Sequence, residues 1–254
     1  MKTLIPLLLL LVAMPSLAQR QFDIEVIIFQ RTVDAESTQE SWPEQLPAIN
    51  FSRSGNLSDA QYRQNRGVMM LDPADYQLTE QSQRLRNHAG FNVLLHTAWR
   101  QGDQGRAAAP RFRIQAGKDY SDQFDSDGTP RMADEISISM IEGVTEQAIR
   151  PALHELDGTL QIYVQHFLFA EANFDLKKPV VREVMIQQAA NSAEDKDTAN
   201  GVQEGHFMPI SPVKEQQSFL KSYRFDQKRR MRSGETHYFD HPLMGMIIQV
   251  RRVE

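Results

Sequence analysis

The stretch FDIEVIIFQ, residues Phe22 to Gln30, decides how this chain folds. It begins with alternation, because Phe22, Ile24 and Val26 are apolar and the residues between them are acidic. Alternation with a period of two is typical of a β-strand with one buried face. The next three residues, IIF, are apolar on both faces, as in a strand that enters the centre of a sheet. We therefore expect a fold centred on a β-sheet.

Four further segments have strand-like patterns. They are residues 91–100, 111–115, 159–169 and 246–250. In the first of these, one face is expected to carry Phe91, Val93, Leu95, Thr97 and Trp99. This face contains the larger apolar side chains, so we expect Trp99 to pack in the core rather than to contact a ligand.

Helical patterns are few. Thr79 is expected to cap a helix in which Leu78, Leu85 and Ala89 share a face, and Gly90 is expected to end it. Residues 144–156 also have helical spacing, although a proline interrupts them. This pattern predicts an α+β fold, with a single domain over residues 19–254, a mainly antiparallel β-sheet, few helices and long polar loops. The composition of residues 191–206 predicts a disordered loop.

The first 18 residues have the pattern of a secretory signal peptide. Lys2 provides a positive charge, residues 4–12 are almost entirely apolar, and Ser16 and Ala18 are the small residues that signal peptidase reads. The apolar run is too short to span a membrane, and no second run of about 18 apolar residues follows it. The sequence has no cysteine, which excludes a lipoprotein anchor and a disulfide. We expect a periplasmic protein without a membrane anchor.

Composition and the absence of catalytic motifs limit the classes of function that the chain can have. The formal net charge is −5, and it becomes −6 without residues 1–18, because that segment holds one lysine. An acidic, secreted chain is not expected to bind nucleic acid. The sequence lacks the motifs G-x-S-x-G and H-E-x-x-H, a P-loop and a cysteine nucleophile. We therefore predict a protein that is not an enzyme and that needs no cofactor or metal.

The densest group of potentially functional side chains lies near the C-terminus. His237, Asp240 and His241 could bind a metal or perform acid–base chemistry. Two histidines four residues apart suit a metal only on a shared helix face, whereas Gly234 and Pro242 indicate a turn here. The alternative is a turn whose aromatic and imidazole groups pack locally or contact a ligand. The sequence leaves both interpretations open.

A basic run precedes this turn. On a strand, Lys228, Arg230 and Arg232 would face one way and Arg229 the other. Such a run can be a solvated strand edge, or it can hold carboxylates, which arginine does with two parallel hydrogen bonds. Trp42 lies in a polar loop, where an indole could stack on a sugar ring. The predicted ligand or partner surface comprises Arg230, Arg232, His237, Tyr238, His241 and Trp42.

Four segments resemble one known family. They read FDIEVIIF (22–29), LLHTAWRQ (94–101), LDGTL (156–160) and RMRSGETHYFDHPL (230–243), and the last is long and distinctive. Together they resemble the CsiV family of periplasmic peptidoglycan-binding proteins, over residues 22–253. One departure is visible. Members often read Leu-His-Leu-Asp-Ala-Asp where this chain has LFAEAN at 168–173, so ligand contacts through that histidine and those aspartates would be lost here.

The resemblance implies a non-enzymatic factor that binds peptidoglycan and supports cell-wall synthesis. It also implies a partner, the outer-membrane lipoprotein that activates a class A penicillin-binding protein. Two alternatives are kept. The first is an envelope hydrolase that uses His237, Asp240 and His241, and the second is a scaffold that contacts only envelope proteins.

Overall fold

The computed structural model describes residues 20–131, 140–141, 144–145, 151–186 and 213–253. The predicted signal peptide (1–18) and disordered loop (191–206) lie outside these residues, and both stay predictions. The chain separates into two compact units. The first comprises residues up to Lys118, His154–Leu176 and residues from Tyr223 onward, and the second comprises Asp119–Leu153 and Lys177–Ser222. The single domain stays a prediction.

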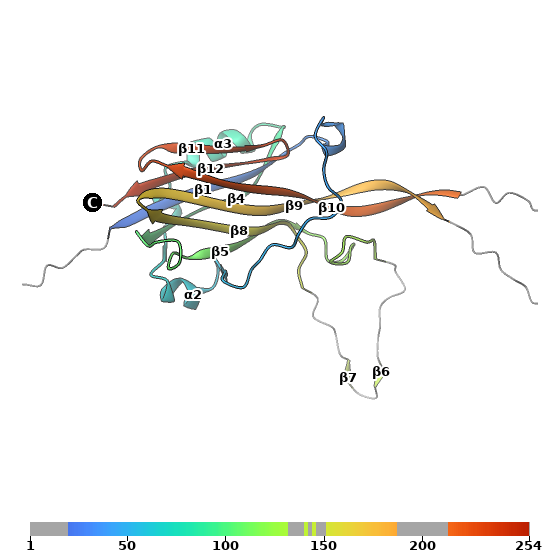
Figure 1. Cartoon of the computed structure of the whole chain (residues 1–254), viewed down its shortest axis with the longest axis horizontal. Helices are drawn as coiled ribbons and strands as arrows, with labels where there is room; N and C mark the ends of the chain where they lie inside the picture. The colour runs from blue at the N-terminus through green and yellow to red at the C-terminus, as the bar shows by residue number, and fades with distance from the viewer. Residues whose placement is uncertain (1–19, 132–139, 142–143, 146–150, 187–212, 254) are drawn as a thin grey trace, which may run out of the picture. The chain divides into compact units, whose positions relative to one another are not determined.

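The framework of the first unit consists of strands from two five-stranded sheets (Figure 1), and the parts of β9 and β10 within residues 177–222 belong to the second unit. In order across sheet A lie β11 (Thr236–His241), β12 (Met244–Arg252), β1 (Gln21–Arg31), β4 (Phe91–Gly102) and β3 (Met69–Met70). In order across sheet B lie β10 (Val213–Met231), β9 (Phe167–Ile186), β8 (His154–Gln165), β5 (Arg111–Asp119) and β2 (Gly55–Asn56). The pairs with a described register are antiparallel, apart from the short parallel pair of β2 with β5. The predicted fold class, mainly antiparallel with few helices, is confirmed.

The main core lies between the two sheets. Ile24, Val26 and Ile28 of β1 contribute to it from sheet A, as the alternation in the sequence predicts. Trp99 of β4 is fully buried, and its ring meets that of Phe112 of β5 edge-on with 5.3 Å between the ring centroids. The prediction that Trp99 is a core residue is therefore confirmed, and this contact joins the two sheets.

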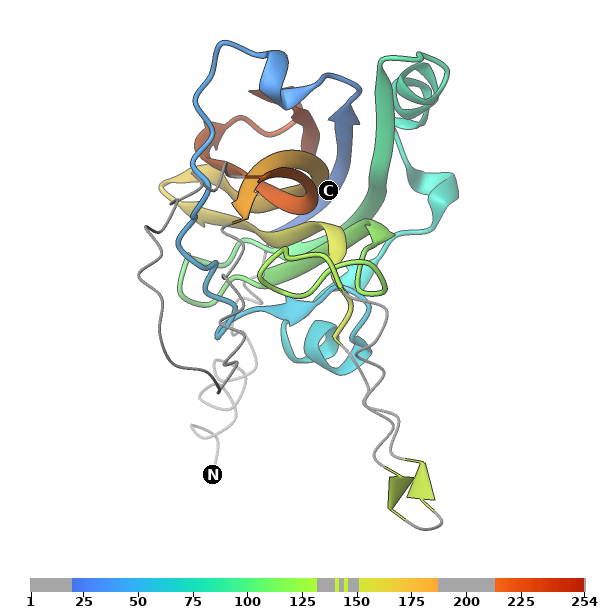
Figure 2. The same ribbon diagram turned by 90° about the vertical axis from the view of Figure 1, so that its right-hand side faces the viewer.

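The other face of β1 is buried against a helix. Ile27 and Phe29 form a second apolar cluster with Leu78, and Leu85 packs against it. Leu78 and Leu85 come from the region of α3 (Thr79–Arg86), which lies beside β4 on the outside of sheet A (Figure 2). This cover explains why the sequence turns apolar on both faces in the middle of β1.

The predicted helix is confirmed, but its ends differ from the expectation. Thr79 is the first helical residue rather than the cap, and the helix ends at Arg86 rather than at Gly90. The capping position is Leu78, which has no side-chain cap. Instead the carboxylate of Glu25, from β1, accepts hydrogen bonds from the backbone N–H groups of Gln77 and Leu78 at 2.7 and 2.8 Å. A distant acidic residue therefore holds the two residues just before the helix, and the helix itself has no side-chain cap.

The face predicted for residues 91–100 is wrong at its beginning. The register against β1 shifts between Ile28 and Phe29, so that Leu95 pairs with Ile28 but Val93 pairs with Phe29. The extra residue is a β-bulge, which transfers the residues before it to the opposite face. Val93 therefore packs in the cluster under α3, whereas Trp99 packs in the main core.

Two other predicted elements are corrected. Residues 159–169 are not one strand, because the chain reverses at His166 between β8 and β9. His166 has a left-handed backbone with φ of 60°, which lets Gln165 and Phe167 pair across the turn. Residues 144–156 do not form a helix where they are described, since Val144–Thr145 is β7 and the segment from His154 belongs to β8.

The remaining elements are short. The first unit also contains η1 (Ala35–Ser37), α2 (Ala60–Asn65) and η2 (Pro73–Asp75), and α2 lies beside β5 (Figures 1 and 2). In the second unit, β6 (Met140–Ile141) pairs with β7, and Tyr120, Phe124 and Leu220 form a small apolar cluster. Among the described residues, no helix is both long and apolar enough to cross a membrane.

Candidate functional site

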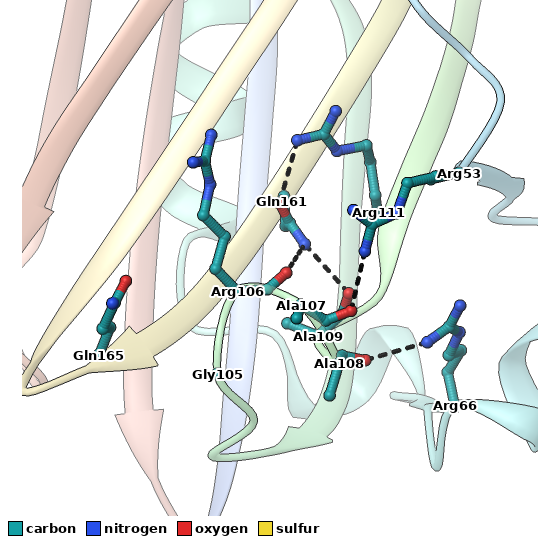
Figure 3. A pocket seen from close by; sticks show the side chains of 10 residues that line it. All are labelled: Arg53, Arg66, Gly105, Arg106, Ala107, Ala108, Ala109, Arg111, Gln161 and Gln165. Carbon is teal, nitrogen blue, oxygen red and sulfur yellow. Dashed lines mark hydrogen bonds between the residues drawn. The ribbon is translucent and has the colours of Figure 1, made fainter.

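A cavity of about 700 Å³ opens beside the loop that joins β4 to β5 (Figure 3). The loop provides one wall, which includes the small side chains of Ala107 and Ala108. Gln161 and Gln165 of β8 also line the cavity. The remaining wall is basic, because four arginines line the cavity: Arg53, Arg66, Arg106 and Arg111. We call these four residues the arginine cradle.

Side chains of the cavity fix the loop by its backbone carbonyls. The amide nitrogen of Gln161 donates to the carbonyls of Arg106 and Ala109, at 2.9 and 3.1 Å. Arg53 donates to the carbonyl of Ala107 at 3.1 Å, and Arg66 donates to that of Ala108, also at 3.1 Å. Four successive carbonyls, 106–109, are thus held by side-chain donors, as Figure 3 shows. The loop is preorganised around the cavity.

The arginine cradle carries more positive than negative charge. Glu171 of β9 lies 2.9 Å from Arg106 and 3.4 Å from Arg111, and the same carboxylate oxygen makes both contacts. Its hydrogen bond raises the pKa of Arg106, which keeps that guanidinium charged. Within the described part of the chain, no carboxylate lies within ion-pair distance of Arg53 or Arg66. Four positive charges therefore face one negative charge.

Other arginines of the same unit are neutralised individually. Arg113 of β5 binds Asp157 through two hydrogen bonds of 2.9 and 2.7 Å. Arg224 of β10 binds Asp175 in the same two-pronged way, at 2.6 and 3.2 Å. Arginines paired in this way stabilise a sheet face, but the carboxylate already neutralises their charge, so they would bind an anionic ligand weakly. The arginine cradle differs from them in its unbalanced charge.

A row of cations over aromatic rings follows the same face of sheet B. Tyr163 of β8 pairs across the strands with Phe169 of β9, and their rings stack at 5.5 Å. The guanidinium of Arg106 lies 6.0 Å from the centroid of Tyr163, and the ammonium of Lys228 lies 5.4 Å from that of Phe169. One residue pair further along the strands, Arg230 lies 3.3 Å from the centroid of the Phe167 ring. We call these contacts the cation–ring row.

The row contains one of the residues predicted from the sequence. Lys228 and Arg230 lie over rings of β9, whereas Arg229 turns the other way, donates to the carbonyl of Tyr238 and lies over Phe239. The alternation predicted for the basic run is therefore confirmed for Lys228, Arg229 and Arg230, whereas Arg232 lies beyond the end of β10. Through Tyr163 and Arg106, the row is continuous with the arginine cradle.

The other predicted residues lie around β11. Arg232 and Glu235 are exposed and lie 3.5 Å apart across the turn. The ring of His237 accepts a hydrogen bond from the backbone N–H of Arg232 at 3.1 Å. The hydroxyl of Tyr238 accepts a hydrogen bond from Arg31 at 2.6 Å and donates one to Asp240 at 2.8 Å.

Trp42 and His241 lie together, half-buried. Their ring centroids are 5.3 Å apart, and Trp42 also meets Tyr223 edge-on. The indole N–H of Trp42 donates to the carbonyl of Ala35 at 3.1 Å. Burial lowers the pKa of His241, so its ring is neutral near pH 7. Trp42 therefore packs against the core as well as lying near the surface.

His237, Asp240 and His241 do not converge. They all belong to β11, in which successive side chains point to opposite faces, so Asp240 faces away from both histidines. Asp240 is engaged by Arg31 and Tyr238, and His241 packs against Trp42 and Phe225. Four residues along a strand also separate the two histidines by about 13 Å. The geometry does not assemble the catalytic or metal-binding group that the hydrolase hypothesis requires.

Comparison with known families identifies the chain. It matches the family described as "Peptidoglycan-binding protein, CsiV" over residues 2–253, which is nearly its whole length. The chain belongs to the CsiV family. No curated protein and no solved structure matches it. Membership of a peptidoglycan-binding family indicates a place in the cell envelope.

The departure from the usual CsiV pattern at residues 168–173 falls on the candidate site. Leu168, Ala170 and Ala172 are buried in the core, so Phe169, Glu171 and Asn173 occupy the outer face of β9. Glu171 provides a carboxylate that contacts Arg106 and Arg111. Phe169, in place of histidine, contributes a ring to the cation–ring row. The outer face of β9 thus contributes a carboxylate and an aromatic ring to the contacts of the site.

Sequence reasoning missed the arginine cradle. Its four members come from the segment before β2, the C-cap of α2, the β4–β5 loop and the first residue of β5. They form no run and no recognisable spacing. The available signal was weaker: Arg106 and Arg111 flank the small-residue segment AAAP at 107–110, which is typical of a short loop.

Proposed function

We propose that this CsiV protein is a non-catalytic periplasmic factor that binds peptidoglycan at the arginine cradle. The observation that carries the proposal is the unbalanced charge of the cradle on a chain whose formal net charge is −5. Arg53 and Arg66 hold loop carbonyls and Arg106 and Arg111 pair with Glu171, but none of these contacts requires four positive charges beside one carboxylate. A ligand that supplies the missing negative charge explains their presence.

The chemistry of peptidoglycan fits this surface in two ways. Its stem peptides carry carboxylates, which guanidinium groups bind through charge-assisted hydrogen bonds. Its glycan carries acetamido sugars with apolar faces, which aromatic rings can contact. The cradle offers guanidinium groups for the carboxylates. The half-exposed ring of Phe167, in the cation–ring row, offers an aromatic face for the sugars.

The surface predicted from the sequence enters this proposal as a second contact. Arg230 is the member best placed for it, because it lies in the cation–ring row that leads to the cradle. Arg232, His237 and Tyr238 would extend the contact toward β11. Trp42 and His241 would take part through the exposed portions of their rings.

A role in wall synthesis is the second part of the proposal. The family resemblance supports a partnership with the outer-membrane lipoprotein that activates a class A penicillin-binding protein. Co-purification of the tagged full chain with that lipoprotein from envelope extracts is the test. If the lipoprotein is absent from the eluate while sacculus binding is normal, this part of the proposal fails.

Sedimentation with insoluble sacculi tests peptidoglycan binding directly. The wild-type protein should pellet with sacculi, and less of it should pellet as salt rises, because salt screens exposed charges. Arg53→Gln with Arg66→Gln should release it into the supernatant. The matched control is Arg84→Gln with Arg86→Gln, which removes two exposed charges from α3 and should pellet normally. If wild-type protein stays in the supernatant at every salt concentration, the protein is a scaffold for other proteins instead.

A further inference from the structure

We propose that the arginine cradle recognises the free carboxylates of the stem peptides, and that Arg53 and Arg66 decide this specificity. The inference rests on the proposed function and deepens it, because it names the part of peptidoglycan that the cavity accepts. The glycan is then a secondary contact, outside the cavity.

The structural role of Arg53 and Arg66 does not require their charge. Each uses one guanidinium nitrogen to hold a loop carbonyl, that of Ala107 or Ala108. Gln161 does the same for two carbonyls of this loop with a neutral amide. Because an amide is sufficient for this purpose, the charge and the remaining N–H donors of both arginines are available for a ligand.

The other two arginines of the cradle are also only partly satisfied. Arg106 and Arg111 share one oxygen of Glu171. The other oxygen of Glu171 is buried and has no hydrogen-bond partner among the described residues. A single carboxylate therefore serves two guanidinium groups through one atom. A carboxylate from a ligand would give each arginine the two-pronged partner that Arg113 and Arg224 already have.

The lining favours a peptide over a sugar. No aromatic ring is among the described residues that line the cavity, whereas sugar rings are commonly held by stacking on such rings. Tyr163, the nearest ring of the cation–ring row, is buried beneath the guanidinium of Arg106. A neutral acetamido sugar would also leave the guanidinium charges unpaired. The volume of about 700 Å³ exceeds the needs of a single small ion and is typical of sites for short organic ligands.

Competition for sacculus binding tests the inference with the full chain. The competitors are a soluble stem tetrapeptide with free carboxylates, the same peptide with every carboxylate amidated, neutral N-acetylglucosamine oligomers as a bare glycan without carboxylates, and inorganic phosphate. The free peptide should displace the protein from sacculi. The amidated peptide should be at least tenfold weaker, and bare glycan and phosphate should compete poorly.

Two substitutions separate charge from geometry. Arg53→Gln with Arg66→Gln should weaken binding of the free peptide at least tenfold. Arg53→Lys with Arg66→Lys keeps the charge but loses the planar fork, so a several-fold loss is expected. The control Arg84→Gln with Arg86→Gln should bind the peptide like wild type. If a cradle variant does not fold, the comparison of free with amidated peptide on wild-type protein decides the question alone.

The possible failures are distinguishable. If wild-type protein does not pellet with sacculi, the proposed function itself is wrong. If it pellets but the free and amidated peptides compete equally, or bare glycan competes best, carboxylate recognition is wrong while peptidoglycan binding stands. If phosphate competes as well as the free peptide, the cradle is a general anion site, and the specificity assigned to it is overturned.

Discussion

Sheets A and B each carry a cluster of charged side chains on the face away from the main core, and the two clusters are built in opposite ways. On sheet A, one carboxylate, that of Glu25, is fully buried and meets His96 at 2.9 Å, Arg251 at 3.0 Å and two backbone N–H groups. Beside sheet B, the arginine cradle has four guanidinium groups and one carboxylate, that of Glu171, which contacts only Arg106 and Arg111.

The difference separates charges that are compensated within the fold from charges that we propose bind a ligand. Burial alone would raise the pKa of Glu25, but hydrogen bonds from His96, the backbone at Gln77 and Leu78, and Arg251 lower it to about 2. Its charge is thus stabilised entirely from within the protein. The cradle lacks this internal compensation, and the proposed ligand would provide it. Substitutions should accordingly change stability in the first cluster and binding in the second.

The largest effect is expected for Glu25→Ala. It leaves Arg251 and the N–H groups that precede α3 without their buried partner, which should lower the free energy of unfolding by about 3–5 kcal/mol. Urea unfolding followed by circular dichroism measures the loss. The fraction that remains folded should still pellet with sacculi. Normal stability with lost binding would reverse the roles assigned to the two clusters.

The pH dependence of stability sharpens the same contrast. The folded pKa of Glu25, about 2, lies below its ordinary value of 4.5, so its contribution is complete above pH 4.5 and is lost as the pH falls toward 2. The lost contribution amounts to about 3 kcal/mol. Unfolding measured between pH 6 and 2 should show this loss, and Glu25→Gln should show correspondingly less pH dependence. Identical pH profiles for the two proteins would exclude Glu25 as the main acid-sensitive group.

A smaller effect is expected from Arg230→Gln with Arg232→Gln. Arg230 stacks on Phe167 at the surface, and Arg232 pairs with an exposed Glu235, a kind of ion pair that contributes at most about 1 kcal/mol. The melting temperature should change little, whereas sacculus or partner binding should weaken several-fold. A drop of many degrees in melting temperature, with normal binding by the folded protein, would make this segment structural.

The smallest effect is expected from Glu171→Gln, which should strengthen ligand binding, whereas the arginine substitutions should weaken it. The substitution removes the one carboxylate that competes with a ligand for Arg106 and Arg111, while an amide oxygen can still accept a hydrogen bond. Stem-peptide binding should become a few-fold tighter, as measured by isothermal titration calorimetry. Weaker binding would show that Glu171 positions the two arginines instead of competing for them.

The sequence predicted the strands whose pattern is local. β1, β4, β5 and β12 were found because alternation along a strand reports directly which face is buried. Errors arose where a single residue changes the geometry. The bulge before Leu95 and the reversal at His166 each depend on pairing with another strand, which leaves no periodic trace. The contact that holds the residues before α3 was missed because its acceptor, Glu25, lies more than fifty residues earlier in the chain.

For the site, the sequence alone determined the chemistry available and the family, because long motifs such as residues 230–243 keep their identity without a structure. It also placed Arg230 on the correct side of its strand. Only the tertiary structure decided which arginines lie together. Arg53, Arg66, Arg106 and Arg111 are brought around one cavity by the parallel pairing of β2 with β5 and by the loop that Gln161 holds. Charge imbalance is a property of neighbours in space, and neighbours in space are set by strand pairing rather than by the order of residues along the chain.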